Sequence, residues 1–171
     1  MVHHIHTPFL WSIEYGWSAG ARSIWVLPDA YPYIKDGHTQ CAVIARSKNH
    51  YSPGEENEFY RLNYNPVSPD PKQYHLIHWR GITFTIFNCF ELTDIAHRSV
   101  FRGKVDALIA VEWNKDTDYF SNIMETTACD LHCTIIQVNT SDFGDSRIYT
   151  PYHDGYKRNI IRVKAEKIQH C

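Results

Sequence analysis

Three short apolar segments in the second half of the chain, separated by helix-length stretches, limit the possible folds more than any other feature. Residues 82–88 (ITFTIFN) alternate between apolar and polar side chains, residues 105–113 (VDALIAVEW) are almost continuously apolar, and residues 133–139 (CTIIQVN) form the third segment. A continuous apolar run is typical of a strand buried on both faces, as in a parallel sheet. The segments predict an α/β fold with right-handed strand–helix–strand connections.

The two stretches between these strands carry helix signals. Residues 94–102 are expected to form a short helix ended by Gly103, which suits a left-handed C-cap. Residues 118–131 place apolar side chains near helical spacing, and Asp116 or Thr117 could cap their N-terminus. The second half of the chain is therefore expected to alternate strand and helix.

The remaining segments predict strands and one long loop. Residues 22–28 and 41–46 are expected to be neighbouring strands, joined across a turn near residues 36–37. Residues 49–73 are rich in Pro, Asn, Asp and Ser and predict a long loop, which in a compact domain is usually functional or disordered. The C-terminal segment is expected to be a hairpin that turns at residues 154–155.

Composition excludes several classes of protein. The chain has 171 residues, 43% hydrophobic and 21% charged, which suits one domain with a hydrophobic core and not a disordered or membrane-spanning chain. No apolar run is long enough to cross a bilayer, and the first residues lack a signal peptide pattern. A formal charge of −2 argues against extensive nucleic-acid binding. Five cysteines, an odd number without paired spacing, indicate reduced thiols and a cytoplasmic setting.

Cys89 is the first candidate for chemistry, because it follows directly on the predicted strand 82–88 and precedes a helix start near Asp94. Ligands of α/β sheets bind beyond the carboxyl ends of the strands. Backbone N–H groups at the helix start could stabilise both a thiolate and an oxyanion. The competing interpretation is a buried packing thiol, which is the commoner fate of a lone cysteine.

Lys48 is the second candidate, because it also closes a predicted strand and enters a turn followed by acidic residues. If Lys48 and Cys89 converge at one sheet edge, the ammonium group would stabilise the negative oxygen of a tetrahedral intermediate. The alternative is an ordinary solvated lysine.

Several segments, taken in order, resemble the carbon–nitrogen hydrolase family, the nitrilases and aliphatic amidases. They are KNHY followed by an acidic pair, then FTIFNCFELTD, RGKVDALIAVEWN and IMETTACDLHCTIIQVNTSDFGDSRIYTP. The resemblance covers about residues 22–165, and the ordered set carries it, not any single motif. A narrower similarity links the chain to nitrilase-like domains at the C-terminal ends of some bacterial reverse-transcriptase polypeptides.

The resemblance implies roles for individual residues. It makes Cys89 the nucleophile, Lys48 the catalytic lysine and Glu56, or its neighbour Glu55, the glutamate that holds the lysine. The backbone N–H of Phe90 would help to bind the oxyanion, and the expected substrate-site residues are Trp113 and Glu125. The implied reaction is hydrolysis of an amide, nitrile or carbamoyl group through a cysteine thioester, without cofactor or metal.

The resemblance also implies a fold, a four-layer α-β-β-α sandwich, and members of the family pair sandwich to sandwich. The sequence departs from the family pattern near its start, where a strand, a general-base glutamate and a helix are expected. Glu14 is the only early glutamate, and it lies too close to the strand 22–28 to fit that role well. Residues 1–171 are therefore expected to form a single, N-terminally truncated carbon–nitrogen hydrolase-like domain, lacking the first strands and helix.

Two other functions remain open at this stage. A metal site is suggested by His4 and His6, and by the group Cys129, His132 and Cys133, but no ligand pairs have zinc-site spacing. The second is an inactive interaction module, covered by a second copy or by another domain of a larger polypeptide such as a reverse transcriptase. The basic segment KRNIIRVKAEK could meet an anionic partner, although it also suits a solvated edge strand.

Overall fold

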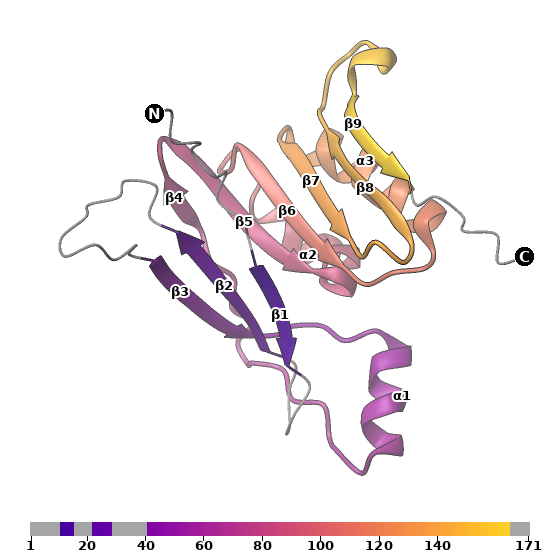
Figure 1. Cartoon of the computed structure of the whole chain (residues 1–171). Coiled ribbons are helices and arrows are strands. Elements are labelled where there is room, and N and C mark those ends of the chain that lie inside the picture. The colour runs from indigo at the N-terminus through magenta and orange to yellow at the C-terminus, as the bar shows by residue number, and fades with distance from the viewer. Residues whose placement is uncertain (1–10, 16–21, 29–40, 165–171) are drawn as a thin grey trace, which may run out of the picture. The chain divides into compact units, whose positions relative to one another are not determined.

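A computed structural model describes residues 11–15, 22–28 and 41–164, with side chains from Arg46 to Lys164. The chain divides into two compact units, Met1–Gln73 and Tyr74–Cys171, and each is described by itself (Figure 1). The expectation of a single domain stays a prediction.

The first unit contains a three-stranded antiparallel sheet with the order β1-β2-β3. Its strands are β1 (Trp11–Tyr15), β2 (Arg22–Pro28) and β3 (Cys41–Ser47). The predicted strand 22–28 is confirmed with the same bounds, and the predicted strand 41–46 is one residue longer. The short strand β1 was not predicted, and the turn expected at residues 36–37 lies outside the described residues.

A helix, α1 (Pro53–Arg61), interrupts the segment that was predicted to be a loop, so that prediction was wrong for these residues. Ser52 is the N-cap: its hydroxyl accepts a hydrogen bond from the N–H of Glu55 at 3.2 Å, and Glu55 Oε2 accepts one from the N–H of Ser52 at 2.7 Å. Pro53 opens the helix, where its missing N–H costs nothing. Ser-Pro-Gly-Glu is thus a capping box, although Pro-Gly alone suggests a turn.

Replacing Ser52 with alanine is expected to lower the free energy of unfolding of this unit by about 1 kcal/mol, because the N-cap hydrogen bond is lost. Urea unfolding followed by circular dichroism would measure the change. Ser141→Ala, at an exposed serine, is the matched control. Equal stability of the two variants would contradict a contribution from the cap.

The second unit contains a six-stranded sheet with the order β4-β5-β6-β7-β8-β9. The middle strands β5, β6 and β7 are parallel and the outer pairs are antiparallel, which confirms the predicted parallel core. The six strands are β4 (Ile77–Trp79), β5 (Ile82–Asn88), β6 (Ala107–Glu112), β7 (Thr134–Asn139), β8 (Gly144–Tyr149) and β9 (Asn159–Lys164).

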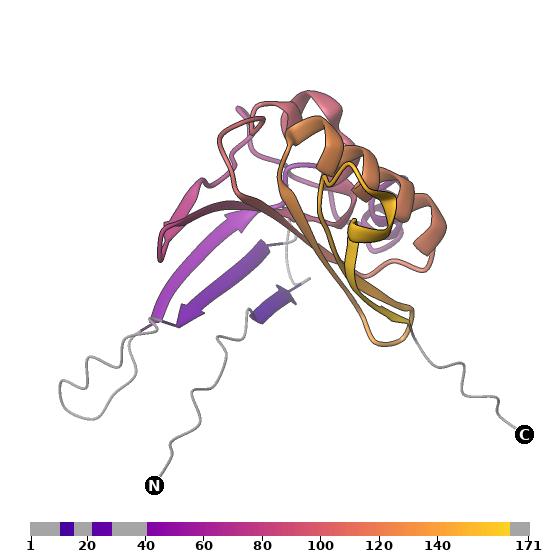
Figure 2. The same ribbon diagram turned by 90° about the horizontal axis from the view of Figure 1, so that it is seen from above.

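The helices of this unit, α2 (Ile95–Ser99) and α3 (Thr117–Leu131), lie on one face of the sheet (Figures 1 and 2). The helix expected at residues 94–102 is shorter in the structure, where α2 covers only Ile95–Ser99 and a 3-10 helix, η1 (Cys89–Thr93), precedes it. Gly103 has φ of 68°, as expected for a left-handed residue. Asp116 caps α3 by accepting a hydrogen bond from the N–H of Tyr119 at 3.2 Å.

The hydrophobic core lies between this sheet and the two helices. Every second residue of the strands faces the helices, and this alternation continues to the last residues of β6 and β7. The side chains with no exposed surface in this layer are Phe87, Leu92, Leu108, Ala110, Met124, Ala128 and Ile135. Because Leu108 and Ala110 face the helices, the alternation along β6 places the side chain of Glu112 on the same face.

The outer strands are joined by hairpins. A two-residue turn, Arg80–Gly81, joins β4 to β5 with φ of 52° and 80°, as a type I′ turn requires. The predicted C-terminal hairpin is formed by β8 and β9, with a short 3-10 helix, η2 (Gly155–Lys157), in its loop. Within the described residues, no helix has the length and apolar character that crossing a membrane requires.

Candidate functional site

Cys89 lies at the end of a central parallel strand, as predicted, and it has an unusual backbone conformation. It follows the last residue of β5, begins η1, is half-buried and is not part of a disulfide. Its φ is 45°, in the left-handed region that residues with a side chain rarely adopt. Backbone strain of this kind costs on the order of 1–3 kcal/mol and is concentrated at functional sites.

Buried charged side chains hold the turn that carries Cys89. Glu91 is fully buried, and its Oε2 accepts a hydrogen bond from the N–H of Asn88 at 2.8 Å. Arg98, on α2, is also buried and donates from Nη1 to the carbonyl oxygen of Leu92 at 3.0 Å. Burial lowers the pKa of Arg98, partly offset by Asp130 and Asp94. The strained conformation is thus held by contacts on both sides of the turn.

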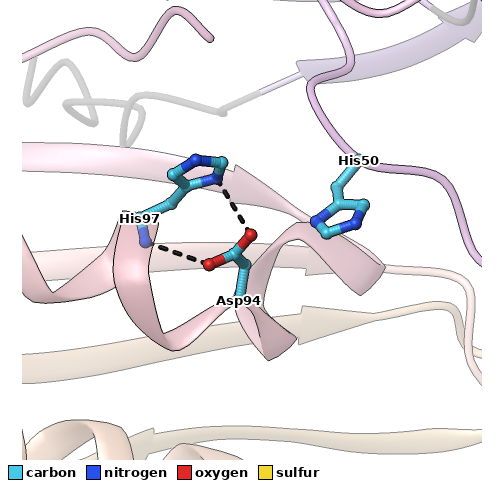
Figure 3. Close-up of side chains that lie close together, drawn as sticks. All are labelled: His50, Asp94 and His97. Carbon is cyan, nitrogen blue, oxygen red and sulfur yellow. Dashed lines mark hydrogen bonds and ion pairs between the residues drawn. The ribbon is translucent and has the colours of Figure 1, made fainter.

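The end of η1 is tied to α2 by Asp94 and His97 (Figure 3). Asp94 Oδ1 accepts a hydrogen bond from the N–H of His97 at 3.1 Å, and Oδ2 lies 3.1 Å from His97 Nδ1. The hydroxyl of Tyr74 lies 3.3 Å from the same ring nitrogen, and the Tyr74 ring stacks on Phe87. These contacts fix the start of α2 on β5. His50, also drawn in Figure 3, belongs to the other unit.

In the first unit, Lys48 follows β3 and is 1% exposed. Its Nζ donates to Glu55 Oε1, and the same carboxylate completes the capping box of α1. The partner of Lys48 in the structure is therefore Glu55, the neighbour that the family pattern also allowed. A role for Glu56 stays a prediction.

A buried polar network lies where β6, β7 and β8 meet α3, and sequence analysis missed it. Glu112 Oε2 accepts a hydrogen bond from Gln137 Nε2 at 2.7 Å. Arg147 donates from Nη1 to the Ser121 hydroxyl at 2.7 Å and pairs through Nη2 with Asp145. The only sequence signal is an acidic residue at the end of an apolar run, because the partners are remote in sequence.

The carboxyl groups of this network differ in their ionisation. Burial raises the pKa of Glu112 to about 7, although the hydrogen bond from Gln137 and the charge of Arg147 act against it. Burial also acts to raise the pKa of Asp145, but hydrogen bonds from Arg162 and Arg147 prevail and lower it. Asp145 has φ of 67° beside a bulge between β8 and β9, so a second strained residue lies in the network.

Solved structures of carbon–nitrogen hydrolases have a similar fold. A CN-hydrolase superfamily protein from Xanthomonas campestris, with an arsenic adduct in its active site, superposes with a TM-score of 0.64 at 14% identity. It matches over 91% of this chain and 57% of its own. An amidase from Nesterenkonia, of the nitrilase superfamily, gives 0.63 at 12% identity over 92% and 57%.

The chain has the nitrilase fold. It spans 57% of the length of these two nitrilase-fold chains. No family model matches the sequence, and no curated protein matches it. The similarity to reverse-transcriptase-linked nitrilase domains stays a prediction.

The other residues expected in the nitrilase site lie near the same sheet edge or on α3. Phe90 is half-buried in η1, and its carbonyl oxygen accepts from the Thr93 hydroxyl at 2.8 Å. Trp113 directly follows β6, is 68% exposed and lies 6.0 Å from Phe143 between ring centroids. Glu125 is half-buried on α3, close enough to Arg162 of β9 to help raise its pKa. Their substrate roles stay predictions.

Asn139, the last residue of β7, fixes the loops around Trp113. Its Oδ1 accepts from the N–H of Asn114 at 3.0 Å, and its Nδ2 donates to the carbonyl oxygens of Asn114 and Gly144, each at 2.8 Å. One amide thus joins the loop after β6 to the start of β8. These hydrogen bonds therefore hold the sheet edge beside Trp113 and Phe143.

The cysteines near the end of α3 have different surroundings from Cys89. Cys129 is exposed, and Cys133 is buried beside the core. Burial raises the pKa of Cys133 to about 11, with a further contribution from Asp106. The metal-site interpretation of Cys129, His132 and Cys133 stays a prediction. His4 and His6, the other metal candidates, lie outside the described residues.

Proposed function

We propose that this chain provides the nucleophile and the catalytic lysine of a hydrolase that cleaves non-peptide C–N bonds. The observation that carries the proposal is the strained Cys89 at the end of a central parallel strand in a nitrilase fold. In a mutant of the Nesterenkonia amidase, the acetamide moiety of fluoroacetamide is added covalently at the active-site cysteine. Amides are therefore the first substrate class to test here.

In the proposed mechanism, a general base removes the thiol proton and Cys89 Sγ attacks the carbonyl carbon of an amide. The Lys48 ammonium and the backbone N–H of Phe90 stabilise the oxygen that becomes negative. The C–N bond breaks, the amine leaves with a proton, and water hydrolyses the thioester to the acid and the free thiol. A nitrile would form a thioimidate with Cys89; one water would add to it, ammonia would leave to give the thioester, and a second water would hydrolyse the thioester.

The identity of the base is a separate part of the proposal. Glu14 belongs to β1, where its backbone pairs with Ser23 of β2. Glu14 or a carboxylate of another polypeptide would fill the role. An ordinary thiol has a pKa of about 8.5, so a nearby cation or base is needed for reactivity near neutral pH.

The proposal predicts that Lys48 promotes ionisation of Cys89. Iodoacetamide labelling of Cys89, followed by peptide mass spectrometry across pH 5–10, should give an apparent thiol pKa below about 8.5. The variant Lys48→Met should raise it by about one unit, because a neighbouring cation is lost. Lys104→Met, at an exposed lysine, is the control and should leave the profile unchanged.

If Lys48→Met left the pH profile of Cys89 labelling unchanged, the result would contradict a site shared by Lys48 and Cys89. A turnover screen of amides and nitriles would then be unwarranted for this chain. The Lys48 and Glu55 pair would in that case stabilise only the turn before α1.

A second candidate function, an interaction module, is favoured by apolar side chains on the sheet face opposite α2 and α3. Val138, Ile161 and Val163 are 44%, 50% and 59% exposed on that face. A covering domain or a second copy of the chain would bury these side chains, and a homo-oligomer therefore stays a prediction. The cytoplasmic location also stays a prediction. Turnover by a longer polypeptide but not by this chain would favour that arrangement.

A further inference from the structure

Cys89 and Glu112 each come directly after the last parallel pair of β5 and β6. That pair joins Asn88 to Val111, so Cys89, the first residue of η1, and Glu112, the last residue of β6, follow it at the same sheet edge. Neighbouring strands are separated by about 4.8 Å, which sets the scale of the distance between the backbones of Asn88 and Val111. Both residues belong to the second unit, where sequence analysis gave Glu112 no role.

The surroundings of Glu112 leave its charge without an ion-pair partner among the described residues. Gln137 provides a neutral hydrogen bond, and Oε1 of Glu112 is buried without a hydrogen bond in the described part of the chain. Arg147 directs Nη2 to Asp145 and Nη1 to Ser121, while its Nε is also buried without a partner there. The negative charge of Glu112 is therefore only partly balanced, from a distance, by Arg147.

Other charged groups lie on the elements that carry or adjoin Cys89 and the polar network. They are Glu91 on η1, Asp145 and Arg147 on β8, Arg162 on β9, and Asp118 and Glu125 on α3, which act on Arg162. Arg162 pairs with Asp145, so the cations of the network are directed mainly toward that carboxylate.

We propose that the carboxyl group of Glu112 controls how readily the neighbouring Cys89 thiol loses its proton. When Glu112 is protonated, it adds no charge beside the sulfur. When it is ionised, its negative charge opposes thiolate formation on Cys89. Glu112 acts through Cys89 and is a positioning residue in this sense, not a catalytic one. The inference rests on the proposed function, because Glu112 matters for catalysis only if Cys89 is the nucleophile. The pKa of the Cys89 thiol can be measured without turnover.

The variant Glu112→Gln removes the charge and keeps the side-chain volume. Across pH 5–10, the apparent pKa of Cys89 from iodoacetamide labelling should fall by about one unit, so the labelling rate near pH 7.5 should rise roughly fivefold to tenfold. Asp142→Asn, which removes an exposed carboxylate, should leave the profile unchanged. An unchanged Cys89 profile in folded Glu112→Gln would overturn the proposal.

A second measurement avoids any variant of Glu112. In protein labelled with ¹³C at glutamate carboxyl carbons, Cys89 would be converted to a mixed disulfide with cysteamine, which carries an ammonium group, or with methanethiol, which is neutral. The carboxyl signal that titrates near pH 7 should titrate at lower pH with cysteamine than with methanethiol. Identical titrations would overturn the proposal even if Glu112→Gln did not fold.

These outcomes are separate from those of the hydrolase test. A chain without hydrolase activity in which Glu112→Gln shifts the Cys89 profile supports this inference and opposes the proposed function. If the chain has hydrolase activity but Glu112→Gln leaves the Cys89 profile unchanged, the result supports the proposed function and opposes this inference.

Discussion

Cys89→Ala is expected to reduce hydrolysis by a factor on the order of 10⁵, because the proposed reaction forms its thioester on this sulfur. The fold should persist, since Cys89 is half-buried and is not part of the hydrophobic core. Steady-state turnover of the amide selected in a screen would measure the loss. Cys133→Ala is the matched control, and its activity should remain where the protein is folded. Retained hydrolysis in Cys89→Ala would contradict the assignment of the nucleophile.

Variants at Cys89 should also show how much the strained backbone lowers the free energy of unfolding. Cys89→Gly is expected to be about 1 kcal/mol more stable to unfolding than Cys89→Ala, because glycine adopts a positive φ without the steric penalty of a Cβ atom. The comparison isolates the backbone, since neither variant has a thiol. If Cys89→Gly proved less stable, the turn would not be strained in solution.

Glu112→Gln is expected to change the pH dependence of stability, independently of catalysis. Burial raises the pKa of Glu112 from its ordinary value of 4.5 to about 7 in the folded chain. Between these values the folded state holds a proton that the unfolded state has lost, so stability falls as pH rises. The contribution is fully present below pH 4.5 and is lost through about pH 7, a total of about 3 kcal/mol.

Unfolding by urea at pH 5 and pH 8 would measure this effect. Wild type should lose more stability than Glu112→Gln between the two pH values, and the variant should be the more stable protein at pH 8. Asp142→Asn should follow the wild-type pH dependence, because its carboxylate is exposed. Parallel pH profiles for wild type and Glu112→Gln would show that Glu112 ionises freely.

Local sequence signals predicted the parallel core of the sheet. Residues 82–88 became β5 with unchanged bounds, and the predicted strand 105–113 became the shorter strand β6, Ala107–Glu112. Helix α3 begins one residue before its predicted start, capped by Asp116. These elements were predictable because their apolar periodicity is contained within the segment itself. The position of Cys89 at a strand end followed directly from them.

The remaining features depend on partners that no local pattern identifies. Helix α1 has no buried residue, so it lacks an apolar face to predict it, and only its capping box marks it. Glu55, and not Glu56, pairs with Lys48, and the same Glu55 carboxylate also accepts a hydrogen bond from the N–H of Ser52. Glu112 and Gln137 are 25 positions apart, and their contact follows from strand register. Sequence spacing alone cannot supply that register.

The six strands of the second unit stand in the sheet in the same order as in the chain. During synthesis, each new strand can therefore add to the free edge left by its predecessor, and none must insert between two strands already paired. Such growth keeps each loop closure short, which favours rapid folding. A polypeptide stalled on the ribosome after β7 would already contain the edge that bears Cys89, so thiol labelling of stalled chains would time the appearance of this site.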